Sequence, residues 1–397
     1  MSVEVNVVGT QCKLACSYCY QLPVRQATKN RAPVLNHEAI QTAVLAANPG
    51  PAGFSVFGGE PLLAKVEDLE RIWAFGLERY GSNGIQTSGA PITEEHLALF
   101  KRYKVHVGFS IDGPGALNDA RVAGSPAATR AATAHSIAMM GRCLTDGIGC
   151  SLIVTLHRLN AAPDRLPELL DWFRKLDAAG LSNARLHLLE RDGPGGERLA
   201  LTDEENTAAL FAARDLQEEM RLRFDVFSDI ENKLRDQGGS ASCVWNGCDP
   251  WTTPAVHGIE ADGSRSLCQR VHKDGQKWSP ADSRSNIRQQ VLWSTPQNQG
   301  GCNGCRFFLQ CGGHCPGTAI DGDWRNRTLD CRTWFALMER IEGEMVSRGE
   351  SPASLAPDLE ARIERSLTLS NAGGHGDAHG DSPHGDEHGD HTDGSAR

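Results

Sequence analysis

The fold of this chain is constrained most by a regular alternation of strand-like and helix-like segments over its first 225 residues. Short apolar runs that suit buried strands are separated by amphipathic stretches long enough to form helices. This alternation predicts an α/β fold in which right-handed crossover helices connect six parallel strands, in a sheet that is either open or closed into a barrel. The expected strands are 3–8, 54–57, 85–87, 105–111, 151–156 and 184–189. The expected helices are 37–47, 66–80, 94–102, 127–144, 166–179 and 203–224.

Residues with unusual chemistry follow four of the expected strands. In a TIM-type barrel the loops at the carboxyl ends of the strands carry the chemistry. Because these loops share one rim, we expect them to form one active site. They are the cysteine-rich loop after the first strand, Gly58-Gly59-Glu60-Pro61 after the second, Gln86-Thr87-Ser88-Gly89 after the third and Ser110-Ile111-Asp112-Gly113-Pro114 after the fourth.

Charge and hydropathy exclude several classes of protein. The chain has 397 residues, which is enough for two or three domains, and a net charge of −10. An acidic balance argues against a nucleic-acid-binding protein, which normally carries a basic face. No apolar run reaches the ~18 residues of a membrane span, and the N-terminus does not read as a secretory signal. We therefore expect a cytoplasmic protein with neither nucleic acid nor membrane as a partner.

The chain contains thirteen cysteines, and this high number is the most informative feature of its composition. In a reducing compartment, clustered cysteines more often bind metal or take part in catalysis than form disulfides. Three lie within the first twenty residues and eight lie between Cys243 and Cys331, which predicts a metal protein with two metal-binding regions. The remaining two, Cys143 and Cys150, are expected to be buried structural thiols.

The N-terminal cysteines have the spacing Cys12-x3-Cys16-x2-Cys19 and no fourth partner. A structural zinc site needs four ligands, so a partial zinc knuckle is the weaker alternative. A [4Fe–4S] cluster held by three cysteines leaves one iron open, which is what cleavage of S-adenosylmethionine (SAM) requires. This spacing, with Tyr18 before the last cysteine, resembles the radical SAM superfamily.

Downstream motifs add to the resemblance. Gly58-Gly59-Glu60-Pro61 resembles the GGEP motif of the family, although such a sequence alone also suits a strand-ending turn. The resemblance implies that Glu60 accepts a hydrogen bond from the SAM ammonium. Gln86-Thr87-Ser88-Gly89 resembles a QTNG motif with Ser88 in place of asparagine, and Asn118-Asp119-Ala120-Arg121 resembles H-D-x-x-R without its histidine. The cofactor-binding residues implied in this way are Tyr18, Gly58, Gly59, Glu60, Pro61, Gln86, Ser110 and Asp112.

The second cysteine region resembles the SPASM domain, with its pattern C-x(9–15)-G-x4-C followed by C-x2-C-x5-C-x3-C and a last cysteine. Two zinc sites on a ribbon-like module are the alternative, since Cys-x2-Cys is also zinc spacing. The resemblance implies two closed [4Fe–4S] clusters, and so three clusters in all. The implied ligands are Cys243, Cys248, Cys268 and Cys315 for the first auxiliary cluster, and Cys302, Cys305, Cys311 and Cys331 for the second.

The resemblance implies an oxidoreductase that cleaves SAM to a 5′-deoxyadenosyl radical and oxidatively modifies a peptide. The substrate class expected from it is a ribosomally synthesised peptide that gains a crosslink or a thioether. A flavodoxin or ferredoxin is the expected electron donor. Because the first cysteine lies at position 12, we also expect that a separate protein could bind a leader peptide.

Three alternatives remain open at this point. Sulfatase maturation to formylglycine is disfavoured because Gln269 stands where those enzymes commonly keep an aspartate base; Asp249 and His257 are weak substitutes. Dehydrogenation of a small molecule is the second alternative. A non-catalytic iron–sulfur carrier or zinc-binding protein is the third, and it predicts no SAM cleavage.

The resemblance implies a radical SAM domain over residues 1–225, folded as a partial (β/α)6 TIM-type barrel. An auxiliary-cluster domain over 226–348 follows, in which about 240–335 is expected to be loop-rich and 332–348 a short helix. A helical extension over 349–372 comes next, with a second short helix at 353–367. The last segment, 373–397, has a composition of histidine, glycine and acid that cannot bury a core, so a disordered tail is expected. Its histidines make weak metal binding the alternative role.

Overall fold

The structure is a computed structural model that describes residues 2–27, 33–48, 50–191, 195–237, 241, 243–245, 247–251, 255–272 and 287–369. The expected His-Gly-Asp tail lies outside the described residues. The strands are β1 Ser2–Asn6, β2 Phe54–Phe57, β3 Asn83–Thr87, β4 Val105–Ser110, β5 Cys150–Leu156, β6 Asn183–Leu188, β7 Arg223–Phe224, β8 Val256–Glu260 and β9 Arg265–Ser266.

Helices follow nearly every strand. In the N-terminal half they are α1 Leu22–Ala27, α2 His37–Ala47, η1 Pro61–Leu63, α3 Val66–Tyr80, α4 Glu94–Arg102, η2 Gly115–Asn118, α5 Pro126–Thr145, α6 Arg158–Ala161, α7 Leu166–Ala178, α8 Gly196–Leu199, α9 Asp203–Gln217 and α10 Asp225–Leu234. In the C-terminal part they are η4 Cys243–Trp245, α11 Gln269–His272, α12 Ile287–Ser294, η5 Gln297–Gln299, α13 Phe308–Cys311, η6 Pro316–Thr318, η7 Ile320–Gly322, α14 Cys331–Ser347, η8 Ala353–Leu355 and α15 Leu359–Leu369.

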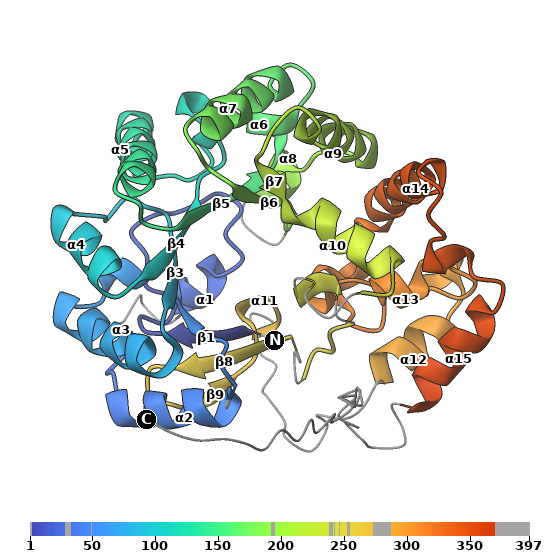
Figure 1. The fold of residues 1–397 in the computed structure, drawn as a ribbon, viewed down its shortest axis with the longest axis horizontal. Coiled ribbons are helices and arrows are strands. Elements are labelled where there is room, and N and C mark those ends of the chain that lie inside the picture. Colours follow the sequence, from blue (N-terminus) through green and yellow to red (C-terminus); the bar gives the residue numbers. More distant parts are fainter. Residues whose placement is uncertain are drawn as a thin grey trace, which may run out of the picture.

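The described strands form one open sheet in the order β7-β6-β5-β4-β3-β2-β1-β8-β9. All neighbouring pairs are parallel except β8 and β9. The sheet curves, and its crossover helices cover the outer face, as Figure 1 shows. The predicted α/β fold is therefore confirmed.

Two elements differ from the prediction. The helix expected over 203–224 ends at Gln217, and the short strand β7 and helix α10 follow it. The segment 240–335, expected to be loop-rich, contributes β8, which pairs with β1 through registers such as Val5↔Ile259. The sheet thus recruits a strand from beyond residue 225.

The two faces of the sheet differ in polarity. Most side chains that point outward are apolar and are buried beneath the helices, as in a sheet covered by crossovers. Many side chains on the inner face are polar and half-buried, so the inner face is the one that can meet a ligand. Examples from four strands are Ser55, Gln86, Thr155 and His187.

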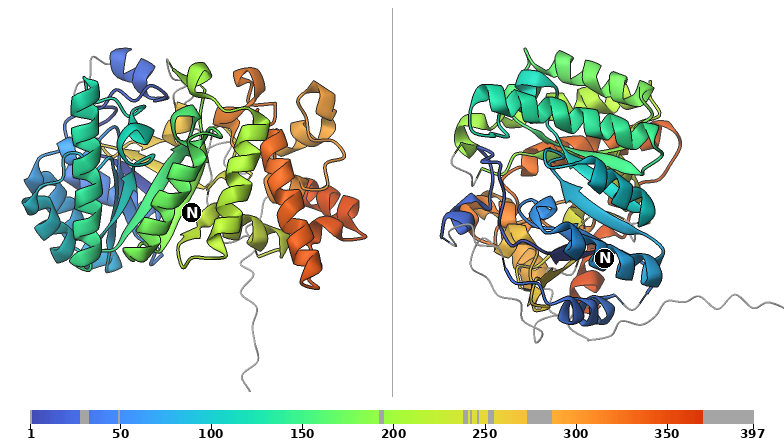
Figure 2. Two further views of the ribbon diagram at one scale, coloured as in Figure 1. Left: turned by 90° about the horizontal axis from the view of Figure 1, so that it is seen from above. Right: turned by 90° about the vertical axis from the view of Figure 1, so that its left-hand side faces the viewer.

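The C-terminal region packs against α9 and α10 at the β6 and β7 end of the sheet (Figure 2). Arg214 of α9 pairs with Glu231 at 2.6 Å and with Glu344 of α14 at 2.9 Å. Trp334 and Ile341 belong to the same apolar cluster as Val5 of β1. One continuous core therefore joins the barrel to the cysteine-rich region.

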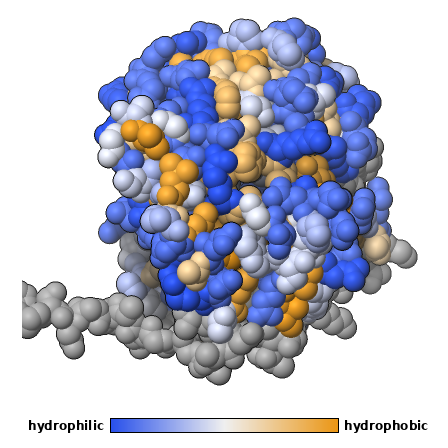
Figure 3. Space-filling model, turned by 90° about the vertical axis from the view of Figure 1, so that its right-hand side faces the viewer, coloured by the Kyte–Doolittle hydropathy of each residue, from blue (hydrophilic) through white to orange (hydrophobic). Residues whose placement is uncertain are grey.

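Seen from the side of the C-terminal region, the surface is mostly hydrophilic and is interrupted by narrow apolar strips (Figure 3). No helix among the described residues combines the length and hydropathy needed to cross a bilayer.

Candidate functional site

The loop after β1 carries Cys12, Cys16 and Cys19, all of them partly exposed. Backbone hydrogen bonds tie it to the loop after β4, from Ala15 to Val122 at 2.7 Å and from Ser17 to Ala120 at 2.8 Å. The buried Arg25 donates to the carbonyl of Leu14 at 2.7 Å. These contacts hold the three thiols at the carboxyl end of the sheet, where the sequence placed them.

Gly58 and Gly59 allow the loop after β2 to lie directly against the cysteine loop. The Gly59 N–H donates to the Gly9 carbonyl at 2.9 Å, and the Glu60 N–H donates to the Gln11 carbonyl at 2.8 Å. A Cβ on Gly59 would lie 2.4 Å from the Gln11 oxygen, and Gly58 has a φ of +138°. The glycines are therefore required for contact between two protein loops, in addition to any approach to a ligand.

Gly59→Ala is expected to lower the free energy of unfolding by about 1–3 kcal/mol, because the methyl group meets rigid backbone. It should also displace the cysteine loop and reduce iron loading at the first cluster. Urea denaturation and iron analysis of the anaerobic protein measure both effects. Gly141→Ala is the matched control, since no atom lies within 4 Å of its Cβ position on α5, and we expect it to be neutral or stabilising by up to about 1 kcal/mol.

Glu60 lies just beyond these glycines and is 2% exposed. Its carboxylate accepts hydrogen bonds from the Thr87 hydroxyl at 2.7 Å and the Ser88 hydroxyl at 2.5 Å, and from the Ser88 N–H at 3.0 Å. Burial raises the pKa of Glu60, and the bonds from Ser88 and Thr87 oppose that rise. Ser88 thus links the loops after β2 and β3 at the position where the related motif has asparagine.

Asp112, at the end of β4, has no exposed surface. It accepts hydrogen bonds from Arg121 Nε and Nη2, each at 3.0 Å, from the Thr155 N–H at 2.9 Å and from the Tyr18 hydroxyl. His157 Nε2 lies 3.3 Å from the same carboxylate. Burial alone would raise the pKa of Asp112, but Arg121 and His157 outweigh burial and hold that pKa well below its usual range.

The same contacts place two of the predicted cofactor residues. Asp112 and Tyr18 are both buried, and the Tyr18 hydroxyl donates to the Asp112 carboxylate. Asp112 also anchors Arg121, whose guanidinium lies 5.6 Å from the centre of the Tyr18 ring. The cluster formed by Tyr18, Asp112, Arg121 and His157 therefore positions the cysteine loop.

Asp112→Asn is expected to reduce the free energy of unfolding by about 3–5 kcal/mol, because Arg121 would remain buried without a counter-charge. Asp119→Asn breaks the Arg130 pair, in which the arginine side chain is 57% exposed, and should cost below about 1 kcal/mol. Urea denaturation of both variants compares them directly.

The contribution of the Asp112 ion pair to the stability of the fold is expected to be lost at acidic pH. Because the folded pKa of Asp112 is lowered, its ion pair stabilises the fold at every pH above the unfolded value of about 3.9. The stability difference between wild type and Asp112→Asn should stay constant from about pH 5 to about pH 8 and shrink only as the pH falls toward the lowered pKa. A difference that shrinks near neutral pH would contradict this assignment.

The remaining predicted cofactor residues meet at the rim. Gln86 Nε2 donates to the Ser110 hydroxyl at 2.7 Å, so the ends of β3 and β4 are joined through half-buried side chains. Pro61 opens η1, whose first turn Glu60 caps through the Leu62 N–H at 3.3 Å. Gln86 and Ser110 lie on the open inner face, where a ligand could reach them.

The three cysteines of the N-terminal loop lie close enough to influence one another. The pKa of Cys16 is raised to about 12, mainly by burial and further by the nearby Cys19 and Cys12, while Arg121 opposes that rise. Three thiols beside a fixed cation suit the chemistry of a cluster with three cysteine ligands.

In the second region, the thiols that act on Cys248 and on Cys311 come from the two ligand sets that the resemblance implies, and the two clusters stay a prediction. The pKa of Cys248 is raised mainly by burial and further by the neighbouring thiols Cys268, Cys315 and Cys243. The pKa of Cys311 is likewise raised mainly by burial and further by Cys302, Cys331 and Cys305. Four thiols in each group fit a closed [4Fe–4S] cluster in number and donor chemistry. Among the described residues, no three Cys, His, Asp or Glu side chains are close enough together to hold a single metal ion.

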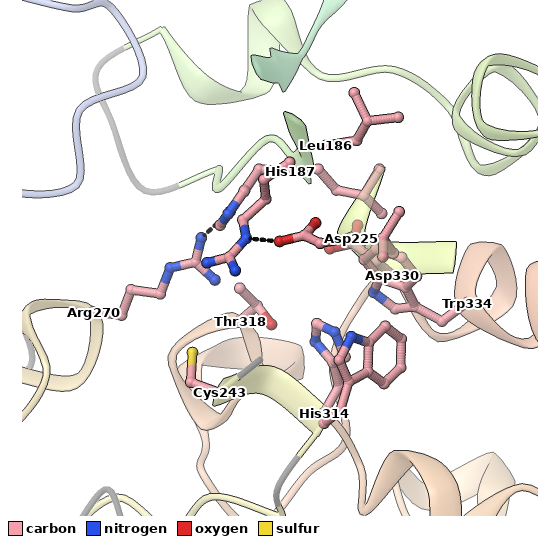
Figure 4. A pocket seen from close by; sticks show the side chains of 13 residues that line it. Leu186, His187, Asp225, Cys243, Arg270, His314, Thr318, Asp330 and Trp334 are labelled. Atoms are coloured by element: carbon pink, nitrogen blue, oxygen red, sulfur yellow. Dashed lines mark hydrogen bonds and ion pairs between the residues drawn. The ribbon is translucent and has the colours of Figure 1, made fainter. Parts of the chain in front are cut away.

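A pocket lies between β6, α10 and the C-terminal region (Figure 4). Arg270 crosses it, with Nη2 at 2.7 Å from His187 Nδ1 and Nε at 2.5 Å from Glu190. Burial, then Arg270 and Arg185, lowers the pKa of His187, so this ring is neutral. Cys243 of the first auxiliary set also lines the pocket.

Of the two weak catalytic candidates, His257 does not lie on the inner face of the sheet. His257 of β8 pairs in register with Val3 of β1, and strand alternation puts it on the outer face, opposite to Glu4 and Glu260. Burial, with Arg265 and the N-terminus, lowers the pKa of His257 to about 4. Asp249 is buried in the turn after Cys248, where it accepts from the Trp251 N–H at 2.8 Å.

Sequence reasoning missed Glu260, the last residue of β8. Its carboxylate accepts from Asn6 Nδ2 at 2.9 Å and from Gln269 Nε2 at 3.4 Å. It therefore lies at the inner rim, beside the position where sulfatase-maturing enzymes commonly keep an aspartate. A strand-like run at 256–260 followed by Asp262-Gly263 is the sequence signal that could have revealed it.

Comparison with known sequences matches residues 6–173 to the radical SAM superfamily. An uncharacterized protein from Synechocystis is 38% identical over 120 residues, which is 27% of this chain and 29% of that protein. A serine-type anaerobic sulfatase-maturating enzyme from Klebsiella aerogenes is 32% identical over 126 residues, covering 30% of this chain and 31% of the relative. The matches thus span less than a third of each relative.

Comparison of structures covers more of the chain. The structure of anSMEcpe with bound AdoMet and a Cp18Cys peptide aligns with a TM-score of 0.69 at 18% identity, over 87% of this chain and 98% of that one. Streptococcus suis SuiB bound to its precursor peptide SuiA aligns with a TM-score of 0.54 at 15% identity, over 83% of this chain and 75% of SuiB. At these identities the likeness shows a shared fold.

Proposed function

Because residues 6–173 match the radical SAM superfamily and part of the chain is similar to anaerobic sulfatase-maturating enzymes, we propose that the chain is a radical SAM enzyme that oxidatively modifies a peptide. The product that we favour is a crosslink or thioether in a ribosomally synthesised peptide. Family membership implies a [4Fe–4S] cluster and SAM, which supply a 5′-deoxyadenosyl radical when bound. Two auxiliary clusters complete the proposed cofactor set.

The observation that carries the proposal is the meeting of the cysteine loop with the loops after β2, β3 and β4. Gly59 and Glu60 bond to the cysteine loop, and Glu60 is held in turn by Ser88. Cys12, Cys16 and Cys19 would hold the open cluster, and Gln86 and Ser110 would orient SAM from the inner face. The cluster of Tyr18, Asp112, Arg121 and His157 would keep the cysteine loop in place.

The pocket at β6 is the proposed peptide site. It borders His187 of the barrel and Cys243 of the first auxiliary set, so a substrate there would lie between the two kinds of cluster. Two structural neighbours are described as complexes with peptides, which supports a peptide as the occupant. The ion pairs of Arg185 with Asp225 and of Arg270 with Glu190 line it with polar groups that can bind a peptide backbone.

Glu260 is the carboxylate that we assign to proton transfer, in place of Asp249 and His257. Oxidative modification removes a hydrogen atom, an electron and a proton from the peptide, and the proton needs an acceptor at the rim. Glu260→Gln is expected to lower the rate of product formation by about 10²–10⁴-fold, the usual contribution of a general base. Formation of 5′-deoxyadenosine should persist, and equal loss of both would contradict the assignment.

The proposed function is tested by incubating the reduced, reconstituted enzyme with SAM and with peptides encoded beside its gene. We expect 5′-deoxyadenosine and a peptide that is lighter by two hydrogen atoms. An aldehyde-reactive reagent separates the alternatives, because it labels formylglycine and leaves a crosslink or thioether unlabelled. Absence of 5′-deoxyadenosine would overturn the enzyme assignment, and turnover of a small molecule alone would overturn the peptide assignment.

A further inference from the structure

Arg288 of α12 is a fully buried cation at the centre of the cysteine-rich region, with no exposed surface. All three of its guanidinium nitrogens donate to backbone carbonyls. Nε bonds to Trp324 at 2.8 Å. The terminal nitrogens bond to Cys248, Gly312 and His314 at 2.8–3.3 Å, and to Gly313 and Asn326 at 3.1–3.3 Å.

The carbonyls that Arg288 binds belong to the loops of both auxiliary thiol sets. Cys248 is itself in the first set, and His314 precedes Cys315 of the same set. Gly312 directly follows Cys311 of the second set. Gly312, Gly313 and His314 have positive φ values of 57°, 76° and 60°, so three successive left-handed residues present their carbonyls to one side chain.

Arg288 carries its charge in a fully buried position. Among the described residues, no carboxylate forms an ion pair with this guanidinium. A buried cation needs a compensating negative charge, which carbonyl dipoles supply only in part. Two anionic thiolate sets on either side would supply the rest.

We propose that Arg288 serves both auxiliary clusters at once, as the residue that positions their loops and as a positive charge that they share. This inference rests on the proposed presence of the two clusters. A fixed positive charge favours the more negative, reduced form of a nearby cluster. Arg288 therefore keeps both reduction potentials higher than they would be beside a neutral side chain.

The test compares Arg288→Gln with Arg327→Gln in the anaerobic, reconstituted protein. Arg327 donates to the carbonyls of Gln297 and Gly301 at 2.6 and 2.5 Å, and Gly301 directly precedes Cys302 of the second set. The charge of Arg327 therefore lies beside the second set. Redox titration followed by electron paramagnetic resonance measures the potential of each cluster.

We expect Arg288→Gln to shift both auxiliary potentials to more negative values. A change of about tenfold in the ratio of oxidised to reduced cluster corresponds to about 59 mV for one electron. Arg327→Gln should shift only the second. Unchanged potentials in Arg288→Gln, or a shift of one cluster alone, would overturn the inference.

Iron analysis keeps the test decisive when a variant assembles poorly. Loss of about eight iron atoms from Arg288→Gln, with the SAM cluster kept, supports a shared role, and loss of about four contradicts it. If the glutamine variant is insoluble, Arg288→Lys retains the charge and should keep both clusters near wild-type potentials; loss of one cluster would overturn the proposal. A wild-type protein without auxiliary clusters would instead refute the proposed function.

Discussion

Replacing Cys12, Cys16 and Cys19 together by alanine is expected to abolish SAM cleavage. The three thiols are the only ligands assigned to the open cluster, and the loops around them stay tied by backbone bonds that alanine keeps. Iron content should fall from about 12 to about eight atoms per chain, because the two auxiliary sets are untouched. Chromatography of 5′-deoxyadenosine and iron analysis of the reconstituted protein measure the two effects.

The matched control is Cys143→Ala with Cys150→Ala. Both of these thiols are buried in the apolar core, as predicted, and burial raises the pKa of Cys143 to about 12. Inert core thiols behave as small apolar side chains, so this variant should keep its iron and its SAM cleavage. Production of 5′-deoxyadenosine by the triple variant would show that the open cluster is held elsewhere.

Most of the barrel strands were predictable because they carry apolar residues between turn signals. The strand β8 was harder to predict, because Val256–Glu260 holds a histidine, a glycine and a glutamate and lies inside a cysteine-rich segment. Its partner β1 is about 250 residues away in sequence, and such long-range pairing leaves no local signal. The hairpin turn at Asp262-Gly263 was the one local clue.

The candidate site was predictable as a set of loops and less so as a set of contacts. Motif spacing identified Glu60 and Asp112, but only three-dimensional packing shows that Arg121 and His157 enclose Asp112 inside the protein. The same holds for Gly59, whose missing side chain makes room for the Gln11 carbonyl. Arg288 had no sequence signal, because a lone arginine on a short helix usually faces solvent.

Replacing Cys305 and Cys311 by alanine is expected to uncouple the enzyme. Both thiols belong to the second auxiliary set. Burial is the main reason that the pKa of Cys311 is raised, and the other thiols of the set raise that pKa further. An oxidative reaction must remove an electron from the peptide after hydrogen abstraction, and this variant loses part of the route by which that electron leaves. Modified peptide should fall by more than about tenfold, a barrier increase above about 1.4 kcal/mol, while 5′-deoxyadenosine persists.

The alternative role for these clusters is to brace the fold, and it predicts a different pattern. Phe307 lies in the continuous core, between the two cysteines that would be replaced, so a bracing cluster would support the barrel as well. Modified peptide, 5′-deoxyadenosine and soluble protein would then decline together. In an uncoupled enzyme, only the yield of modified peptide would fall. Circular dichroism of the variant, which measures whether the protein is still folded, distinguishes the two cases.

A peptide product of unchanged mass, such as an epimerised residue found by chiral analysis, would contradict oxidation itself, because epimerisation returns the hydrogen atom and needs no electron acceptor.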